Sequence, residues 1–189
     1  MKNSLSIIKH IQKGFTLVEL LIVVIILAIL AAIVVPQFAT TTDDAKISSL
    51  VSTLANTRAA IDLYYQQHGH YPGSVTAAGA TCPAGGTAGT GVATGGAGTT
   101  AEDAFLSQLT NYTNSAGQAC STTDTTFKFG PYLKKRPLPA DPITGTASTI
   151  EVTATGNLVM AATAGNPGGY KYDSKTGKFI ANLTAYETR

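Results

Sequence analysis

The sequence contains 189 residues, a length that fits one domain of ordinary size. Only 13% of the residues are charged, and the net charge is +2. Lys2, Lys9 and Lys13 supply the excess, because the rest of the chain carries 10 basic against 11 acidic side chains, a balance of −1. This balance argues against a protein that binds nucleic acid through its overall charge.

The most apolar part of the chain is the run Leu20–Val35, sixteen consecutive apolar residues. With residues 15–19 it would form a helix about 31 Å long, enough to cross the hydrocarbon core of a bilayer. The three lysines precede this helix, and positive charge is retained on the cytoplasmic side. The sequence therefore predicts a single-pass membrane protein whose C-terminal body lies outside the cytoplasm.

Two ordinary interpretations of this segment compete. A secretory signal peptide requires a cleavage site of small residues after the apolar core, but the small residues of 28–32 lie inside the run. A plain membrane anchor fits the length and leaves Glu19 unexplained, since an unpaired carboxylate in hydrocarbon is disfavoured by several kcal/mol.

The residues at the start of the run read Gly14-Phe15-Thr16-Leu17-Val18-Glu19. This motif resembles the class III signal of type IV prepilins and of type II secretion pseudopilins. The resemblance implies a leader peptide of residues 1–14, cut between Gly14 and Phe15 by a prepilin peptidase in the bacterial inner membrane. It also implies N-methylation of Phe15, identical subunits in a helical filament and an inner-membrane assembly platform as partners.

A filament suggests a role for Glu19 in assembly. The freed ammonium of Phe15 on an incoming subunit could pair with Glu19 of a neighbour in a core of low dielectric constant, where the attraction is strong. Before assembly, Glu19 could pair with its own Phe15 amine or with water. The alternative is a carboxylate that only stabilises the N-terminus of its own helix through the helix dipole.

Helical periodicity continues after Pro36, through apolar positions such as Leu50, Leu54 and Ile61. We predict one helix from about Phe15 to Gln67, with residues 15–35 in the membrane or filament core and residues 36–68 amphipathic. A helix break, either a kink or a melted turn, is expected at Pro36, and Gly69 ends the helix. The resemblance implies local unwinding near Pro36 when the filament forms.

Residues 69–126 form a variable region rich in Gly, Ala and Thr. The stretch 73–100 is predicted to be an exposed loop, because it lacks the Gly-Lys-Ser/Thr ending of a phosphate-binding loop. A short helix is expected over 101–109. Cys82 and Cys120 are an even pair in a region predicted to be exported, which favours one disulfide bond; the alternative is two thiols in a reducing compartment.

Residues 127–189 are predicted to form an antiparallel sheet packed on the helix, so that the fold class is α+β. Strands are expected at 148–155 and 157–162, followed by a hairpin with a turn near Gly177. The Pro-rich segment 132–145 resembles G-type major pseudopilins, and the ending 168–182 resembles pilin-like proteins of both systems.

The chain offers few candidates for a chemical site. G-type pseudopilins carry a calcium site, and the resemblance makes Asp141 and Asp173 candidate ligands here, although the remaining oxygen ligands are not apparent. His68 and His70 lack a third metal ligand nearby. The basic run 134–136 could contact DNA phosphates, or it is a solvated loop. No nucleophile, base and orienting group come together, so we predict that the protein is not an enzyme.

The sequence is therefore interpreted as a structural subunit of a type IV pilus-like filament. Two alternatives remain at this stage. One is the G-type major pseudopilin of a type II secretion system, and the other is a monomeric membrane-anchored protein whose head binds a ligand.

Overall fold

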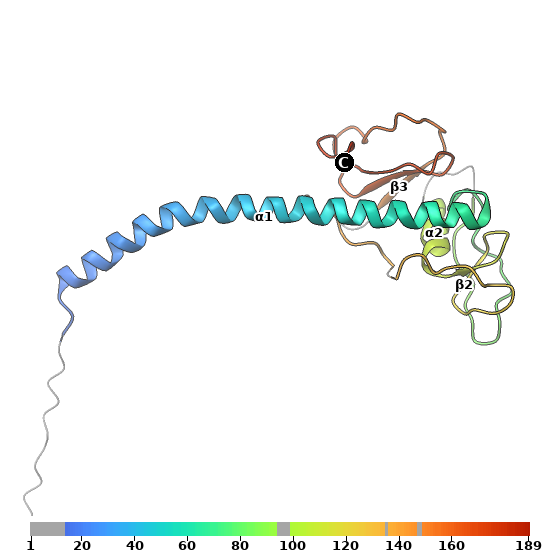
Figure 1. The fold of residues 1–189 in the computed structure, drawn as a ribbon, viewed down its shortest axis with the longest axis horizontal. Helices are drawn as coiled ribbons and strands as arrows, with labels where there is room; N and C mark the ends of the chain where they lie inside the picture. The colour runs from blue at the N-terminus through green and yellow to red at the C-terminus, as the bar shows by residue number, and fades with distance from the viewer. Residues whose placement is uncertain (1–13, 94–98, 135, 147–148) are drawn as a thin grey trace, which may run out of the picture. The chain divides into compact units, whose positions relative to one another are not determined.

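The computed structural model of the chain describes residues 14–93, 99–134, 136–146 and 149–189 (Figure 1). The chain divides into two compact units, Met1–Asp43 and Asp44–Arg189. The elements are a long helix, a second helix and two small sheets, which confirms the α+β fold class. The predicted leader, apart from Gly14, lies outside the described residues.

Helix α1 covers Leu17–His68, 52 residues, and agrees with the predicted helix to within two residues at each end. Gly69 ends it with a positive φ of 74°, and its N–H donates to the carbonyl oxygen of Tyr65 at 2.8 Å. No melted turn interrupts α1 at Pro36, because the helix continues through this residue; a kink there stays a prediction. A missing N–H removes one hydrogen bond of the helix and is tolerated here within a long helix.

The second half of α1 is amphipathic, as predicted. Leu50, Leu54, Ile61 and Tyr64 are fully buried, and their spacing of three, four or seven residues places them on one face. They pack into one core with residues of α2 and of the C-terminal sheet. Burying each side chain of this kind contributes about 1.5–3 kcal/mol, so this stripe holds the helix in the head.

Helix α2 covers Thr99–Thr110, somewhat longer than the predicted 101–109. After it come the short strands β1 (Tyr112–Thr113) and β2 (Ala119–Cys120), which pair antiparallel. The region predicted to be variable therefore contains a buried helix and a small hairpin.

The segment before α2 is less exposed than predicted. The N–H of Ala77 donates to the carbonyl oxygen of Gly91 at 3.1 Å, and that of Gly89 donates to Ala119 at 2.8 Å. Gly91 has a φ of 97°, and a Cβ there would collide with the backbone of α2 at Ala104. Glycine is needed at this position for its conformation and its close approach, so the described part of the loop is packed on α2.

The C-terminal sheet consists of β3 (Ile150–Thr153), β4 (Tyr170–Asp173) and β5 (Phe179–Ala181), in the order β3-β4-β5. The β4–β5 hairpin is antiparallel and turns at Gly177, as predicted. However, β3 pairs with β4 in parallel, so the sheet is mixed rather than antiparallel. The segment between β3 and β4 crosses over and brings the chain back in the same direction.

The strand predicted at 157–162 does not form. Instead, the side-chain oxygen of Asn157 accepts a hydrogen bond from the N–H of Val159 at 2.9 Å. Asparagine commonly forms such local turns, which compete with strand pairing. The segment is therefore part of the crossover loop, and its two large aliphatic residues are exposed.

Candidate functional site

The first turn of α1 is closed by reciprocal hydrogen bonds between Thr16 and Glu19. The N–H of Thr16 donates to Oε2 of Glu19 at 2.9 Å, and the hydroxyl of Thr16 donates to the same oxygen at 2.7 Å. In return, the N–H of Glu19 donates to the Thr16 hydroxyl at 3.2 Å. This is a capping box, which satisfies two N–H groups that a helix start leaves without partners.

The capping box fixes where the charge of Glu19 lies. A carboxylate bound to residue 16 is held at the positive end of the helix dipole, which favours its ionised form. The backbone nitrogen of Phe15 directly precedes that of Thr16 in the chain, and Phe15 is 79% exposed. A cationic amine at residue 15 and the carboxylate would therefore lie at the same helix end.

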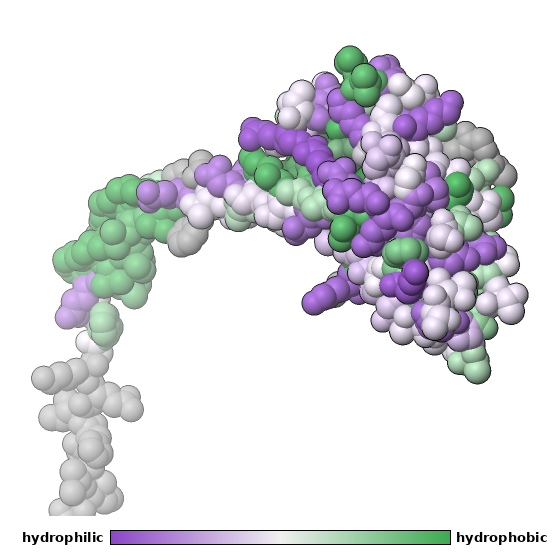
Figure 2. Space-filling model, turned by 45° about the vertical axis from the view of Figure 1, so that its right-hand side comes forward, coloured by the Kyte–Doolittle hydropathy of each residue, from purple (hydrophilic) through white to green (hydrophobic). Residues whose placement is uncertain are grey.

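The apolar residues that follow have no partner in the described part of the chain. The window Leu17–Val34 has a mean hydropathy of 3.3, and none of it is buried. Figure 2 shows a continuous hydrophobic surface on this half of α1, while the head surface mixes polar and apolar residues. By length and composition, this helix can cross a membrane.

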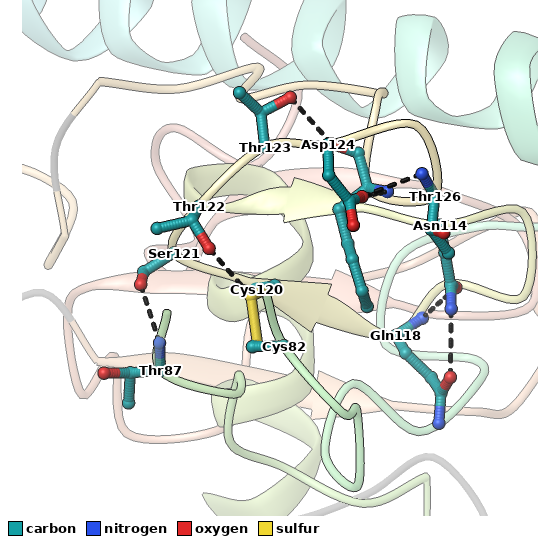
Figure 3. The surroundings of a disulfide bond; sticks show 11 residues. Cys82, Thr87, Asn114, Gln118, Cys120, Ser121, Thr122, Thr123, Asp124 and Thr126 are labelled. Carbon is teal, nitrogen blue, oxygen red and sulfur yellow. Dashed lines mark hydrogen bonds between the residues drawn. A yellow bond between two sulfur atoms is a disulfide. The ribbon is translucent and has the colours of Figure 1, made fainter. Parts of the chain in front are cut away.

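The predicted disulfide is confirmed. Cys82 and Cys120 are bonded, with Cα atoms 5.8 Å apart and 38 positions apart in sequence (Figure 3). Backbone bonds reinforce the same junction: the N–H of Ser121 donates to the carbonyl oxygen of Thr87 at 3.0 Å, and the Thr87 N–H donates to Oγ of Ser121 at 2.9 Å. The disulfide thus ties the loop before α2 to strand β2.

The two aspartates predicted as candidate calcium ligands have other roles. Asp173 is buried and accepts hydrogen bonds from Thr155, Gly156, Lys175 and Thr176. Burial opposes the ionisation of Asp173, but these hydrogen bonds outweigh it and hold the pKa of the carboxyl below its ordinary value.

Asp141 is equally buried and accepts from the N–H of Ile143 at 2.9 Å and the hydroxyl of Thr144 at 2.7 Å. Calcium binds carboxylate lone pairs, and here N–H and O–H donors take them up. Both residues cap loops in this structure, and a calcium-binding role for them stays a prediction.

A cluster of aromatic and histidine rings lies at the end of α1. Tyr64 and His68 are stacked with ring centroids 4.1 Å apart, and His68 Nε2 lies 3.0 Å from the hydroxyl oxygen of Thr113. Burial lowers the pKa of both His68 and His70. Within the ranges that the structure describes, no three His, Cys, Asp or Glu side chains come together in a group that could hold a metal ion.

The basic run 134–136 is partly used within the head. Arg136 forms an ion pair with Asp103 of α2, and its Nη1 donates to the hydroxyl of Ser107 at 3.0 Å. Lys135 lies outside the described residues. Arg136 therefore serves as a contact between the Pro-rich segment and α2.

The structure adds Thr16 to the residues predicted for the N-terminal site. A threonine three positions before a glutamate, followed by an apolar run, is a recognised signature of a helix start. The sequence contains this signal as Thr16-Leu17-Val18-Glu19, directly after the Gly14-Phe15 junction.

Comparison with known proteins points to the same segment. Residues 9–35 match the model of the prokaryotic N-terminal methylation motif. The chain is 42% identical to a fimbrial protein of Neisseria meningitidis over 69 residues, which is 36% of this chain and 41% of the relative. It is 38% identical to a type IV major pilin protein of Neisseria gonorrhoeae over 73 residues, 39% of this chain and 44% of the relative.

The N-terminal part of the chain is therefore similar to type IV pilins. It spans about two fifths of the length of the curated relatives it matches. No solved structure matches it significantly. These curated relatives are named as a fimbrial protein and a type IV major pilin protein, that is, as structural proteins and not as enzymes.

Proposed function

We propose that this chain is a structural subunit of a type IV pilus-like filament, processed between Gly14 and Phe15 and polymerised through α1. The observation that carries the proposal is the start of α1. There, Glu19 lies in the first turn of the helix, in the exposed apolar stretch Leu17–Val34 and inside a segment that matches the methylation motif.

The capping box suggests how assembly would proceed. Cleavage after Gly14 turns the Phe15 nitrogen into an ammonium, which N-methylation leaves cationic. In the free subunit, Thr16 hydrogen bonds keep the Glu19 carboxylate satisfied at the helix end. On addition to a filament, the ammonium of a neighbouring subunit would replace neutral donors with a charge-assisted bond, which is stronger. The low dielectric constant of a helical core strengthens this pairing further.

Before assembly, the subunit would reside in the bacterial inner membrane as a single-pass protein. The lysines ahead of the apolar run favour a cytoplasmic N-terminus and a head on the opposite side. The partners would be a prepilin peptidase that also methylates Phe15, an inner-membrane assembly platform and further copies of the chain. Extension of the filament would take the head from the periplasm to the cell exterior.

A G-type pseudopilin of a type II secretion system is the second candidate. The β4–β5 hairpin with its turn at Gly177 belongs to the segment that resembles both systems. One observation supports the pilus: the named relatives are fimbrial and pilin proteins. If the chain were a monomeric anchored binding protein, neither the methylation motif nor Glu19 would have a role.

Intact mass and N-terminal sequencing of the membrane-extracted protein test processing first. The expected product begins at methylated Phe15. A chain that still begins at Met1, or one cut after the apolar run, would overturn the proposal. Deleting the gene then separates the two systems, because loss of surface fibres indicates a pilus and loss of enzyme export indicates a pseudopilus.

The role of the charge at Glu19 is tested by a matched pair of variants. Glu19→Gln keeps an acceptor for the capping box, which glutamine also forms, but removes the charge. Thr16→Ala removes the cap and keeps the charge. We expect processed Glu19→Gln subunits to remain in the membrane without entering filaments, while Thr16→Ala subunits still assemble. Assembly of Glu19→Gln at the wild-type level would show that Glu19 is only a helix cap.

A further inference from the structure

The crossover loop between β3 and β4 carries an exposed aliphatic tip. Leu158 and Val159 are 75% and 80% exposed, the highest values for large hydrophobic residues in the described part of the head. The tip is held in place, since the Val159 N–H donates to Asn157 and Nζ of Lys178 donates to the Leu158 carbonyl oxygen at 2.7 Å. An apolar projection that is already held in place loses little conformational freedom when it docks.

The head also has an apolar groove between α1 and the Pro-rich segment 132–139, here called the α1 groove. It consists of two depressions of about 250 and 500 Å³ that share Asn56, Leu133 and Lys134. Ala60 and the half-exposed Leu63 line one, and Leu138 lines the other. A cavity of ~150 Å³ already accommodates a benzene-sized group, so each depression can hold an aliphatic side chain.

The tip and the groove lie on opposite flanks of α1. Val159 and Arg58 line the same cavity of about 600 Å³, and Nε of Arg58 donates to the carbonyl oxygen of Phe179 at 2.9 Å. With 3.6 residues per turn, Arg58 lies roughly 160° around the helix from Asn56 and Ala60 of the groove. In Figure 1 the C-terminal strands and the segment leading from β2 accordingly lie on different sides of α1.

We propose that the 158–159 tip of one subunit docks into the α1 groove of the next copy of this chain. A projection and a groove on different faces cannot satisfy one another within a symmetric pair, so the contact is head-to-tail and propagates into a helical array. The occupant is a second copy because this inference rests on the proposed function, in which α1 holds many heads at high effective concentration. Under that condition a contact of two side chains suffices.

Cysteine cross-linking in the full-length chain tests the contact directly. A Leu63→Cys/Val159→Cys variant, mildly oxidised on cells, is expected to give a ladder of dimers, trimers and higher multimers. Each single variant should give no ladder. The control pair Leu63→Cys/Val92→Cys uses Val92, which is 42% exposed in the head and away from both surfaces, and should not cross-link either.

Filament yield gives an independent readout. Leu158→Ser/Val159→Ser should assemble with contacts about tenfold weaker or more, seen as a loss of filaments on shearing, whereas Val92→Ser should behave like the wild type. Wild-type filaments without a ladder, together with shear-resistant Leu158→Ser/Val159→Ser filaments, would overturn the docking while leaving the proposed function intact. If the wild-type chain is processed but forms no filaments, the proposed function fails and the assignment of a second copy fails with it.

Discussion

The two halves of α1 are built from similar aliphatic residues but present them differently. In the first half, Leu17–Val34, every side chain is exposed along the whole helix circumference. In the second half, Leu50, Leu54 and Ile61 are buried on one face. The head supplies the apolar partners of the second half within the chain. In the proposed function, the first half would obtain its partners from outside the chain, from lipid before assembly and from other subunits in the filament.

Exposure in the isolated chain therefore does not by itself show whether a side chain requires water or an apolar medium. Both halves are helical, because the backbone hydrogen bonds of a helix are made within α1 itself. What differs is the medium that each half requires. Substitutions that are equally exposed in the structure should therefore have different consequences, depending on the half in which they lie.

The largest effect is expected from a charge in the first half. Ile26→Lys places an ammonium in the middle of the apolar segment, at a residue that is exposed in the isolated chain. Inserting lysine at the centre of a membrane helix costs about 3 to 10 kcal/mol, so we expect loss of stable membrane insertion. The matched variant Leu158→Lys, on the head, should insert normally. Membrane fractionation measures this, and equal insertion of both variants would contradict the membrane role of the first half.

The next effect concerns the head alone. Removing the disulfide with Cys82→Ser/Cys120→Ser releases a loop that spans 38 positions. We expect the free energy of unfolding of the head to fall by about 3–4 kcal/mol, since the cross-link restricts the unfolded chain. Urea unfolding in detergent, followed by the near-ultraviolet signal of the tyrosines, measures the loss. Membrane insertion is the internal control and should not change.

An effect of similar size separates the halves within one helix. Leu54→Ala removes a fully buried side chain from the core, and such changes destabilise by about 2–5 kcal/mol. Leu30→Ala makes the same change at an exposed position of the first half and should leave the unfolding of the head unchanged. Similar urea midpoints for the two variants would mean that the head does not depend on the α1 stripe.

Local patterns in the sequence predicted much of this arrangement. The apolar run, the later periodicity and Gly69 predicted α1, and the turn at Gly177 predicted the β4–β5 hairpin, because in each case neighbours in sequence determine the structure. The parallel β3–β4 pairing was not predicted, since it depends on where a long crossover returns the chain. Nor was the packing of Gly91 on α2, which depends on a close approach of the loop before α2 to the helix backbone.

The residues of the candidate site also fall into two groups, those that a local sequence pattern predicts and those whose role depends on distant segments. Glu19 and the junction at Phe15 are evident as a linear motif, whereas the hydrogen bonds that Asp173 accepts from Thr155 and Gly156 come from a loop that meets it only in the folded head. A carboxylate flanked by Pro and Gly in a loop has the same appearance in sequence whether it binds a cation or caps a turn. Only the surrounding donors decide between these roles.

The smallest predicted effect is a pH dependence confined to the second unit. Burial lowers the pKa of His68 and His70 in the folded head, so the unfolded chain binds more protons near pH 6. Stability from these residues is therefore complete above their unfolded pKa of about 6.5 and falls as the pH drops below it. The lowered pKa of Asp173 acts only in the more acidic range below its unfolded value of about 4.

Urea unfolding of the head at several pH values between 7 and 5 tests the histidine contribution. We expect the wild-type midpoint to fall over this range and the midpoint of His68→Gln/His70→Gln to stay nearly constant. The first half, Leu17–Val34, contains no histidine. Membrane insertion through it should therefore not change with pH over this range. A midpoint that falls equally in the double variant would assign the pH dependence to groups other than the ring cluster at the end of α1.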